Sequence, residues 1–185
     1  MKKKCLLFGL LPLLMNCTST NEVAKVSTQF IEEVVVIPCS GTEYYTNSEY
    51  FRANSFGEST DHIISKKKAL SNVRSELAGS INTKVQAVID NYLKSSELNN
   101  VEETEERFES LTRVVVKQEL TGIRTICETV TRTSDGKYKT YIAIELSAQD
   151  IIGELQERLS KDEMLKIDYD YEKFKQTFEE EMNRL

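Results

Sequence analysis

The chain has 185 residues, of which 24 are basic and 30 acidic, so its formal net charge is −6. Its hydrophobic fraction of 39% suits one globular domain, which at this length needs no metal or disulfide to be stable. The acidic balance argues against nucleic acid and anionic lipid headgroups as partners, because both require clustered positive charge.

The first seventeen residues have the pattern of a bacterial lipoprotein signal peptide. Three lysines at positions 2–4 precede an apolar run over residues 6–15, and Cys17 lies where the sequence becomes polar. The run is shorter than the roughly 20 residues that a membrane-spanning helix needs. We therefore expect residues 1–16 to be removed and Cys17 to carry diacylglycerol as the first residue of the mature protein.

The residues just before Cys17 match a lipoprotein box only in part. Leu14 supplies the aliphatic residue three positions earlier, but Met15 and Asn16 are larger than the usual small pair. Cys5 precedes the apolar run and is not a candidate acceptor. An ordinary secretory signal cut near the same point is therefore the alternative to lipidation of Cys17.

Removal of the leader changes the charge of the protein. The leader contains three lysines and no acids, so the remaining 169 residues have 21 basic and 30 acidic side chains and a net charge of −9. Such a surface does not attract anionic lipids, so the acyl chains on Cys17 would make the membrane contact. Residues 17–30 are polar and aperiodic, which predicts a tether between lipid and domain.

Two cysteines, Cys39 and Cys127, lie outside the leader. Export would place them where disulfides persist. Cys39 follows a strand-like run and Cys127 lies inside another, so a disulfide between them is one interpretation. Two buried free thiols are the other, because cysteine also serves as a small core residue. Two thiols and the lone His62 lack the spacing of a zinc site, and no metal or cofactor is expected.

The first half of the domain is expected to contain two strands and a long helix. Residues 34–37 are β-branched and are followed by Pro38, which predicts a buried strand, and residues 50–57 form a second one. Apolar residues three and four apart predict a helix over 60–94, with Ser59 or Thr60 as its N-cap. The apolar stripe of this helix contains Leu70, Val73, Leu77, Ile81, Val85, Val88 and Tyr92.

The second half begins with a helix whose first turns, from Glu102, are acidic, as the helix dipole favours. Residues 123–131 and 138–146 predict a hairpin around the turn pair Asp135 and Gly136. A helix is expected directly afterwards, from about Ala148. The last stretch keeps helical apolar spacing through Ile167, Tyr171, Phe174, Phe178, Met182 and Leu185.

These elements predict an α+β domain over residues 31–160 and an amphipathic C-terminal helix over residues 161–185. The fold would be an antiparallel sheet of about four strands packed by a long helix, with additional C-terminal helices. The last helix either packs on the domain or offers a stripe to a partner. Packing is favoured, because an open apolar stripe is a liability.

No catalytic residues are predicted, and the chain is not expected to be an enzyme. The sequence contains no phosphate-binding loop, nucleophile elbow or metalloprotease helix. Its only histidine, His62, lies at a helix start and is poorly placed to act as the base of a triad. A hydrolase built on converging carboxylates is a weaker alternative, and a protein that binds a small ligand between sheet and helices is the main one.

Three segments resemble the bacterial lipoproteins of about twenty kilodaltons, the LPP-twenty-like family of Gram-negative outer membranes. They are residues 50–59, the helical positions Lys68, Ala69, Leu70, Arg74, Leu77 and Ala78, and residues 135–146. The chain departs from the family pattern at Val73 and in its acidic C-terminal helix. The resemblance implies an outer-membrane lipoprotein, periplasmic or surface-facing, with a structural or protein-interaction role in the cell envelope and an unidentified envelope protein as its partner.

Overall fold

The computed structural model describes residues 32, 34–96, 101–120, 122–162 and 169–184. The chain divides into two units, residues 1–35 and residues 36–185, and all the elements discussed below belong to the second. The expected signal peptide, Cys17 and the tether over residues 17–30 lie outside the described residues.

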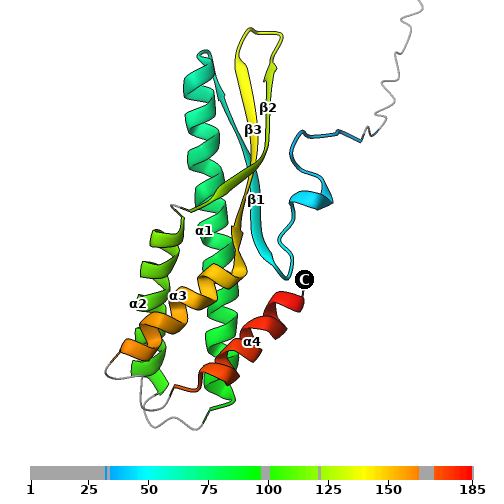
Figure 1. Cartoon of the computed structure of the whole chain (residues 1–185). Coiled ribbons are helices and arrows are strands. Elements are labelled where there is room, and N and C mark those ends of the chain that lie inside the picture. The colour runs from blue at the N-terminus through cyan, green and yellow to red at the C-terminus, as the bar shows by residue number, and fades with distance from the viewer. Residues whose placement is uncertain (1–31, 33, 97–100, 121, 163–168, 185) are drawn as a thin grey trace, which may run out of the picture. The chain divides into compact units, whose positions relative to one another are not determined.

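The second unit is an α+β fold (Figure 1). Its described residues form one three-stranded antiparallel sheet in the order β1-β3-β2. The elements in chain order are a 3-10 turn Thr42–Tyr44, β1 Tyr50–Ser59, α1 His62–Lys94, α2 Val101–Glu119, β2 Arg124–Arg132, β3 Tyr138–Ser147, α3 Ala148–Lys161 and α4 Tyr171–Asn183. The α+β class is confirmed, and the expected number of about four strands is too high by one.

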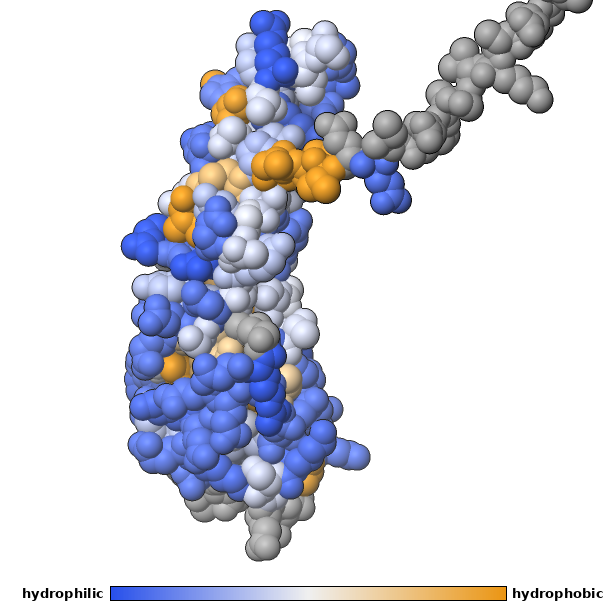
Figure 2. All heavy atoms as spheres, turned by 90° about the vertical axis from the view of Figure 1, so that its right-hand side faces the viewer, coloured by the Kyte–Doolittle hydropathy of each residue, from blue (hydrophilic) through white to orange (hydrophobic). Residues whose placement is uncertain are grey.

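The missing strand is the one predicted at residues 34–37. These four residues are irregular and exposed, with Val34 at 91% and Val36 at 88% of their full accessibility. Figure 2 shows a hydrophobic patch where the described part of the chain begins. A β-branched run becomes a strand only beside an edge with unpaired backbone groups. At Arg52 the outer edge of β1 is already occupied, because the Arg52 N–H donates to the Thr46 hydroxyl at 2.9 Å and that hydroxyl donates to the Arg52 carbonyl at 3.0 Å.

Helix α1 is 33 residues long and begins at His62, two residues later than the predicted helix over 60–94. Asp61, not Ser59 or Thr60, is the N-cap, and its carboxylate accepts a hydrogen bond from the Ile64 N–H at 2.9 Å. The predicted apolar stripe is buried except at Leu70, which is half-buried. The first half of α1 covers one face of the sheet and the second half contacts α2 and α4 (Figure 1).

Helix and sheet approach each other closely where small residues meet. A Cβ placed on Gly57 of β1 would lie 2.4 Å from the backbone nitrogen of Ala69 and 2.4 Å from the carbonyl oxygen of Ser65. The Ser65 hydroxyl donates to the Gly57 carbonyl at 2.9 Å and lies 2.7 Å from the Thr140 hydroxyl. The absence of a side chain at position 57 therefore allows the α1 backbone to rest on β1.

The predicted hairpin and the helix that follows it are confirmed. The turn between β2 and β3 is closed by the Gly136 N–H, which donates to the Thr133 carbonyl at 2.9 Å, and Gly136 has the positive φ of 85° that favours glycine. Ser147 ends β3 and caps α3, so strand and helix join without a loop.

An aromatic cluster forms the core at the helical end of the unit. Tyr92 of α1, Phe108 of α2 and Phe174 of α4 meet with Tyr169, and their ring centroids lie 5.5 to 6.3 Å apart. The apolar stripe of α4 is therefore buried inside the unit through Phe174, Phe178 and Met182. The predicted stripe residues Ile167 and Leu185 lie outside the described residues.

Candidate functional site

A disulfide joins Cys39, which precedes β1, to Cys127 in β2, with an S–S distance of 2.02 Å and Cα atoms 5.6 Å apart. The sequence allowed either this bond or two free thiols. The bond connects positions 88 residues apart and holds the segment before β1 against the sheet. It lies on the face opposite α1, which we call the outer face and which contains Tyr141, Ala143 and Glu145 of β3.

An irregularity in β2 turns Cys127 toward this outer face. The register with β3 shifts between Thr125 and Cys127, so that Thr125 pairs with Ile144 and Cys127 with Ala143. The extra residue, Ile126, reverses the alternation of side chains that a regular strand would keep. The small side chain of Ala143, which is fully buried, lies beside the disulfide position.

Glu145 is a buried carboxylate on the outer face, with its side chain only 3% exposed. It accepts a hydrogen bond from Arg52 Nε at 2.9 Å and another from Arg124 Nε at 2.9 Å. Burial alone would raise the pKa of Glu145, but the hydrogen bonds from Arg124 and Arg52 outweigh it, and the pKa is lowered. Arg52 lies on β1, Arg124 on β2 and Glu145 on β3, so these hydrogen bonds hold the three strands together.

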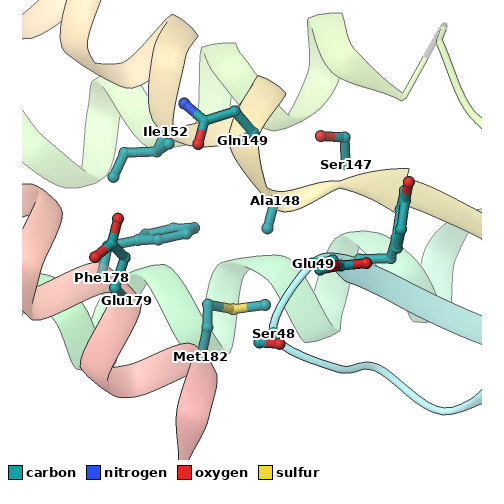
Figure 3. A pocket seen from close by; sticks show the side chains of 10 residues that line it. Ser48, Glu49, Ser147, Ala148, Gln149, Ile152, Phe178, Glu179 and Met182 are labelled. Atoms are coloured by element: carbon teal, nitrogen blue, oxygen red, sulfur yellow. The ribbon is translucent and has the colours of Figure 1, made fainter.

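The clearest cavity is a pocket of about 300 Å³ between the start of β1, the start of α3 and the end of α4 (Figure 3). We call it the α3–α4 pocket. Its buried lining is apolar, from Ile152, Phe178 and Met182. Glu49 and Glu179 lie on opposite sides of it, with Phe178 and Met182 between them (Figure 3). Its other lining residues are Ser48, Tyr50, Ser147, Ala148 and Gln149.

The pocket exists because three distant segments converge. The Ala148 N–H donates to the Glu49 carbonyl at 2.9 Å and so holds the start of α3 beside the start of β1. The ring of Phe178 packs edge-on against Phe51 of β1, with centroids 6.4 Å apart, and this contact positions the last turns of α4. Sequence reasoning identified each element but not the pocket, because no local pattern links positions 49, 148 and 179.

A second, larger hollow of about 560 Å³ lies between α1 and α2. Its lining is almost entirely polar, with Ala87 as the exception. Glu109 and Arg113 form an ion pair across one helical turn at 3.7 Å. The hollow therefore offers a small ligand few apolar side chains to pack against.

His62, the only histidine of the chain, lines neither of these two hollows. His62 is the first residue of α1, and its ring lies 5.7 Å from the ring of Tyr138. Across the described ranges, no three acidic, histidine or cysteine side chains are grouped as a metal site would require. Among the helices that the structure describes, none is long and apolar enough to cross a membrane.

Neither the protein-family models, nor the curated proteins, nor the solved structures contain a match to this chain. Its resemblance to the LPP-twenty-like family therefore stays a prediction from the sequence.

Proposed function

We propose that this protein is a lipid-anchored component of the bacterial cell envelope, attached through Cys17, whose folded unit binds another envelope protein. The observation that best supports the proposal is the disulfide between Cys39 and Cys127. Disulfides persist in exported proteins and are rare in the reducing cytosol. The bond therefore agrees with the leader-like residues 1–16, an independent feature of the sequence.

The anchor would keep the folded unit near the membrane. Twenty-one residues separate Cys17 from Cys39, where the disulfide attaches the chain to the sheet. Even fully extended, this stretch spans at most about 75 Å. Partners of the folded unit would therefore be proteins of the same membrane or of the space beside it, whether the unit faces the periplasm or the cell surface.

Fatty-acid labelling tests the anchor. Cells that express the full chain would be grown with an alkyne analogue of palmitate, and the protein would be recovered and coupled to a fluorophore. We expect label on the wild type and on Cys5→Ala, which leaves the acceptor in place, and none on Cys17→Ala. Label that survives Cys17→Ala, or an unlabelled wild type, contradicts lipidation at Cys17.

Thiol trapping tests export separately. Cells would be quenched in acid and treated with a heavy maleimide that adds mass to each free thiol. We expect Cys39 and Cys127 to be blocked in the wild type, and Cys39 to become reactive in Cys127→Ser. If both cysteines react in the wild type, the protein resides in a reducing compartment and the envelope location is wrong.

The α3–α4 pocket favours a second candidate function, the binding of a small free ligand. Its volume of about 300 Å³ lies at the lower end of the range for ligand sites. The next subsection considers what chemistry the pocket would accept, and its experiment separates a free ligand from a protein partner.

A further inference from the structure

The lining of the α3–α4 pocket has two parts with different chemistry. Ile152, Phe178 and Met182 are each at most 3% exposed and make an apolar floor. Glu49 and Glu179 are exposed carboxylates on opposite sides of that floor (Figure 3). A ligand that fills the pocket would bury an apolar portion against this floor, with one carboxylate on either side of it.

The charges of the pocket are of one sign. None of its ten lining residues is basic. Within the described part of the chain Glu49 makes no ion pair, and Glu179 pairs only with Lys175, one helical turn earlier. Lys175 Nζ lies 4.0 Å from Glu179 Oε1, at the limit of an ion pair. The carboxylates therefore retain most of their capacity to bind a cation from outside.

The helix ends at the pocket agree with this polarity. Glu179 and Met182 belong to the last turns of α4, which ends at Asn183, where the helix dipole is negative and favours cations. A cation of the chain already uses this end, because Lys84 Nζ donates to the Glu181 carbonyl at 2.9 Å. The start of α3 has the opposite polarity, but its amides are partly occupied. The Ala148 N–H donates to the Glu49 carbonyl and the Asp150 N–H to the Ser147 hydroxyl at 3.3 Å. An anion would also have to approach two carboxylates.

We propose that the α3–α4 pocket binds an aliphatic cation, namely a lysine or arginine side chain of the partner protein. The methylene groups would lie on Phe178 and Met182, and the charged end would lie between Glu49 and Glu179. Long basic side chains combine an apolar stem with a charged head in this way, and an aromatic ring face adds a favourable contact with the cation. A volume of about 300 Å³ has room for one such side chain. The identity of the ligand as part of a protein rests on the proposed function above.

The binding test uses the purified, oxidised full chain in mild detergent, labelled with carbon-13 on isoleucine and methionine methyl groups. The probes are n-butylamine and a short lysine-containing peptide, with n-butanol and butyrate as neutral and anionic controls of similar size. We expect the methyl signals of Ile152 and Met182 to shift saturably with both amines and not with the two controls. The proposal is overturned if butanol or butyrate causes saturable shifts as large as those of the amines. It is also overturned if neither amine shifts the methyl signals at about 10 mM.

Charge-neutral variants test the two carboxylates. We expect Glu49→Gln and Glu179→Gln each to weaken binding of the lysine peptide about fivefold, as the loss of one exposed ion pair predicts. Glu180→Gln makes the same change on the next residue of α4, outside the pocket, and should bind within about twofold of the wild type. Equal affinity in all three variants and the wild type contradicts recognition of the cation by Glu49 and Glu179.

The two probes also separate a protein partner from a free amine. If the lysine peptide binds more tightly than butylamine, the side chain of a protein is the better occupant. If butylamine binds more tightly, the pocket is a site for a small amine and the assignment to a partner protein is wrong. Because this binding test uses purified protein, its result does not depend on fatty-acid labelling in cells. Either experiment can fail while the other succeeds.

Discussion

Glu145 shows how one residue of β3 connects the two edge strands of the sheet. Its carboxylate accepts hydrogen bonds from Arg52 on β1 and Arg124 on β2 while its side chain is only 3% exposed. A buried carboxylate without such partners would be strongly destabilising. The two arginines therefore make its burial compatible with folding.

Neutralising Glu145 is expected to destabilise the protein in a pH-dependent way. The pKa of Glu145 in the folded protein lies below its ordinary value of 4.5. Its contribution is therefore present above the pKa of the unfolded chain and is lost as the pH falls through the lowered folded value. We expect Glu145→Gln to lose about 2 kcal/mol of stability near pH 7, with a smaller difference from wild type below about pH 4.

Urea denaturation from pH 7 to pH 3 measures this difference. Glu58→Gln is the matched control, because Glu58 forms an ion pair with Lys137 at 3.2 Å between side chains that are 37% and 42% exposed. That variant should change stability by less than about 0.5 kcal/mol. A constant loss for Glu145→Gln at every pH, or no loss, contradicts the role given to its charge.

At the scale of elements, the contact between α1 and β1 depends on the lack of a side chain at position 57. A Cβ there would lie 2.4 Å from backbone atoms of Ser65 and Ala69, which cannot move without shifting the helix. We expect Gly57→Ala to destabilise the fold by about 2 kcal/mol or more, as overpacking does. Thermal or urea unfolding followed by circular dichroism measures the change.

Gly79 provides the matched glycine. It lies in the middle of α1, and a Cβ added there meets no atom within 4 Å. Alanine has the higher helix propensity, so Gly79→Ala should stabilise the protein by about 0.5 to 1 kcal/mol. If Gly57→Ala left the stability unchanged or raised it as Gly79→Ala does, the close approach of α1 to β1 would not be what requires glycine at position 57.

The elements themselves could largely be predicted, because their signals are local. The apolar spacing of α1, the Asp135 and Gly136 turn and the junction at Ser147 each act within a few residues of the chain. The strand predicted at residues 34–37 failed for a non-local reason. Its β propensity is real, but the backbone N–H and C=O of Arg52, at the edge of β1, are already hydrogen-bonded to the Thr46 hydroxyl.

The candidate sites were less predictable than the elements. Cys39 and Cys127 were a proposed pair, but the register shift beside Thr125, which turns Cys127 to the outer face, has no clear sequence signal. The α3–α4 pocket depends on contacts between residues about 100 and 130 positions apart along the chain, from Glu49 to Ala148 and Glu179. Single-sequence patterns do not report such convergence.

At the scale of the whole molecule, the disulfide joins the segment before β1 to the rest of the fold. The two cysteines are 88 residues apart, and the chain-entropy model assigns about 4 to 5 kcal/mol to closing a loop of that length. Native strain and residual structure usually reduce the measured value, so we expect reduction to cost about 2 to 4 kcal/mol. Urea unfolding with and without a phosphine reductant measures it.

A double variant provides the control for reduction. Cys39→Ser combined with Cys127→Ser should unfold at the midpoint of the reduced wild type and should not respond to the reductant. Hydrogen exchange should show lost protection at the 3-10 turn Thr42–Tyr44, while the centre of α1 remains protected. A reduced wild type as stable as the oxidised protein would contradict the stabilising role of the bond.

The central claim is that the mature protein begins at Cys17 and is held to the envelope by lipid on that residue. The most direct measurement is mass spectrometry of the N-terminal tryptic peptide from protein extracted from membranes. We predict a peptide of residues 17–25 that begins with Cys17 and carries the mass of diacylglycerol, with or without a further acyl chain. Recovery of an unmodified peptide that continues from position 5 through Cys17 to Lys25, with no lipidated form, would contradict it.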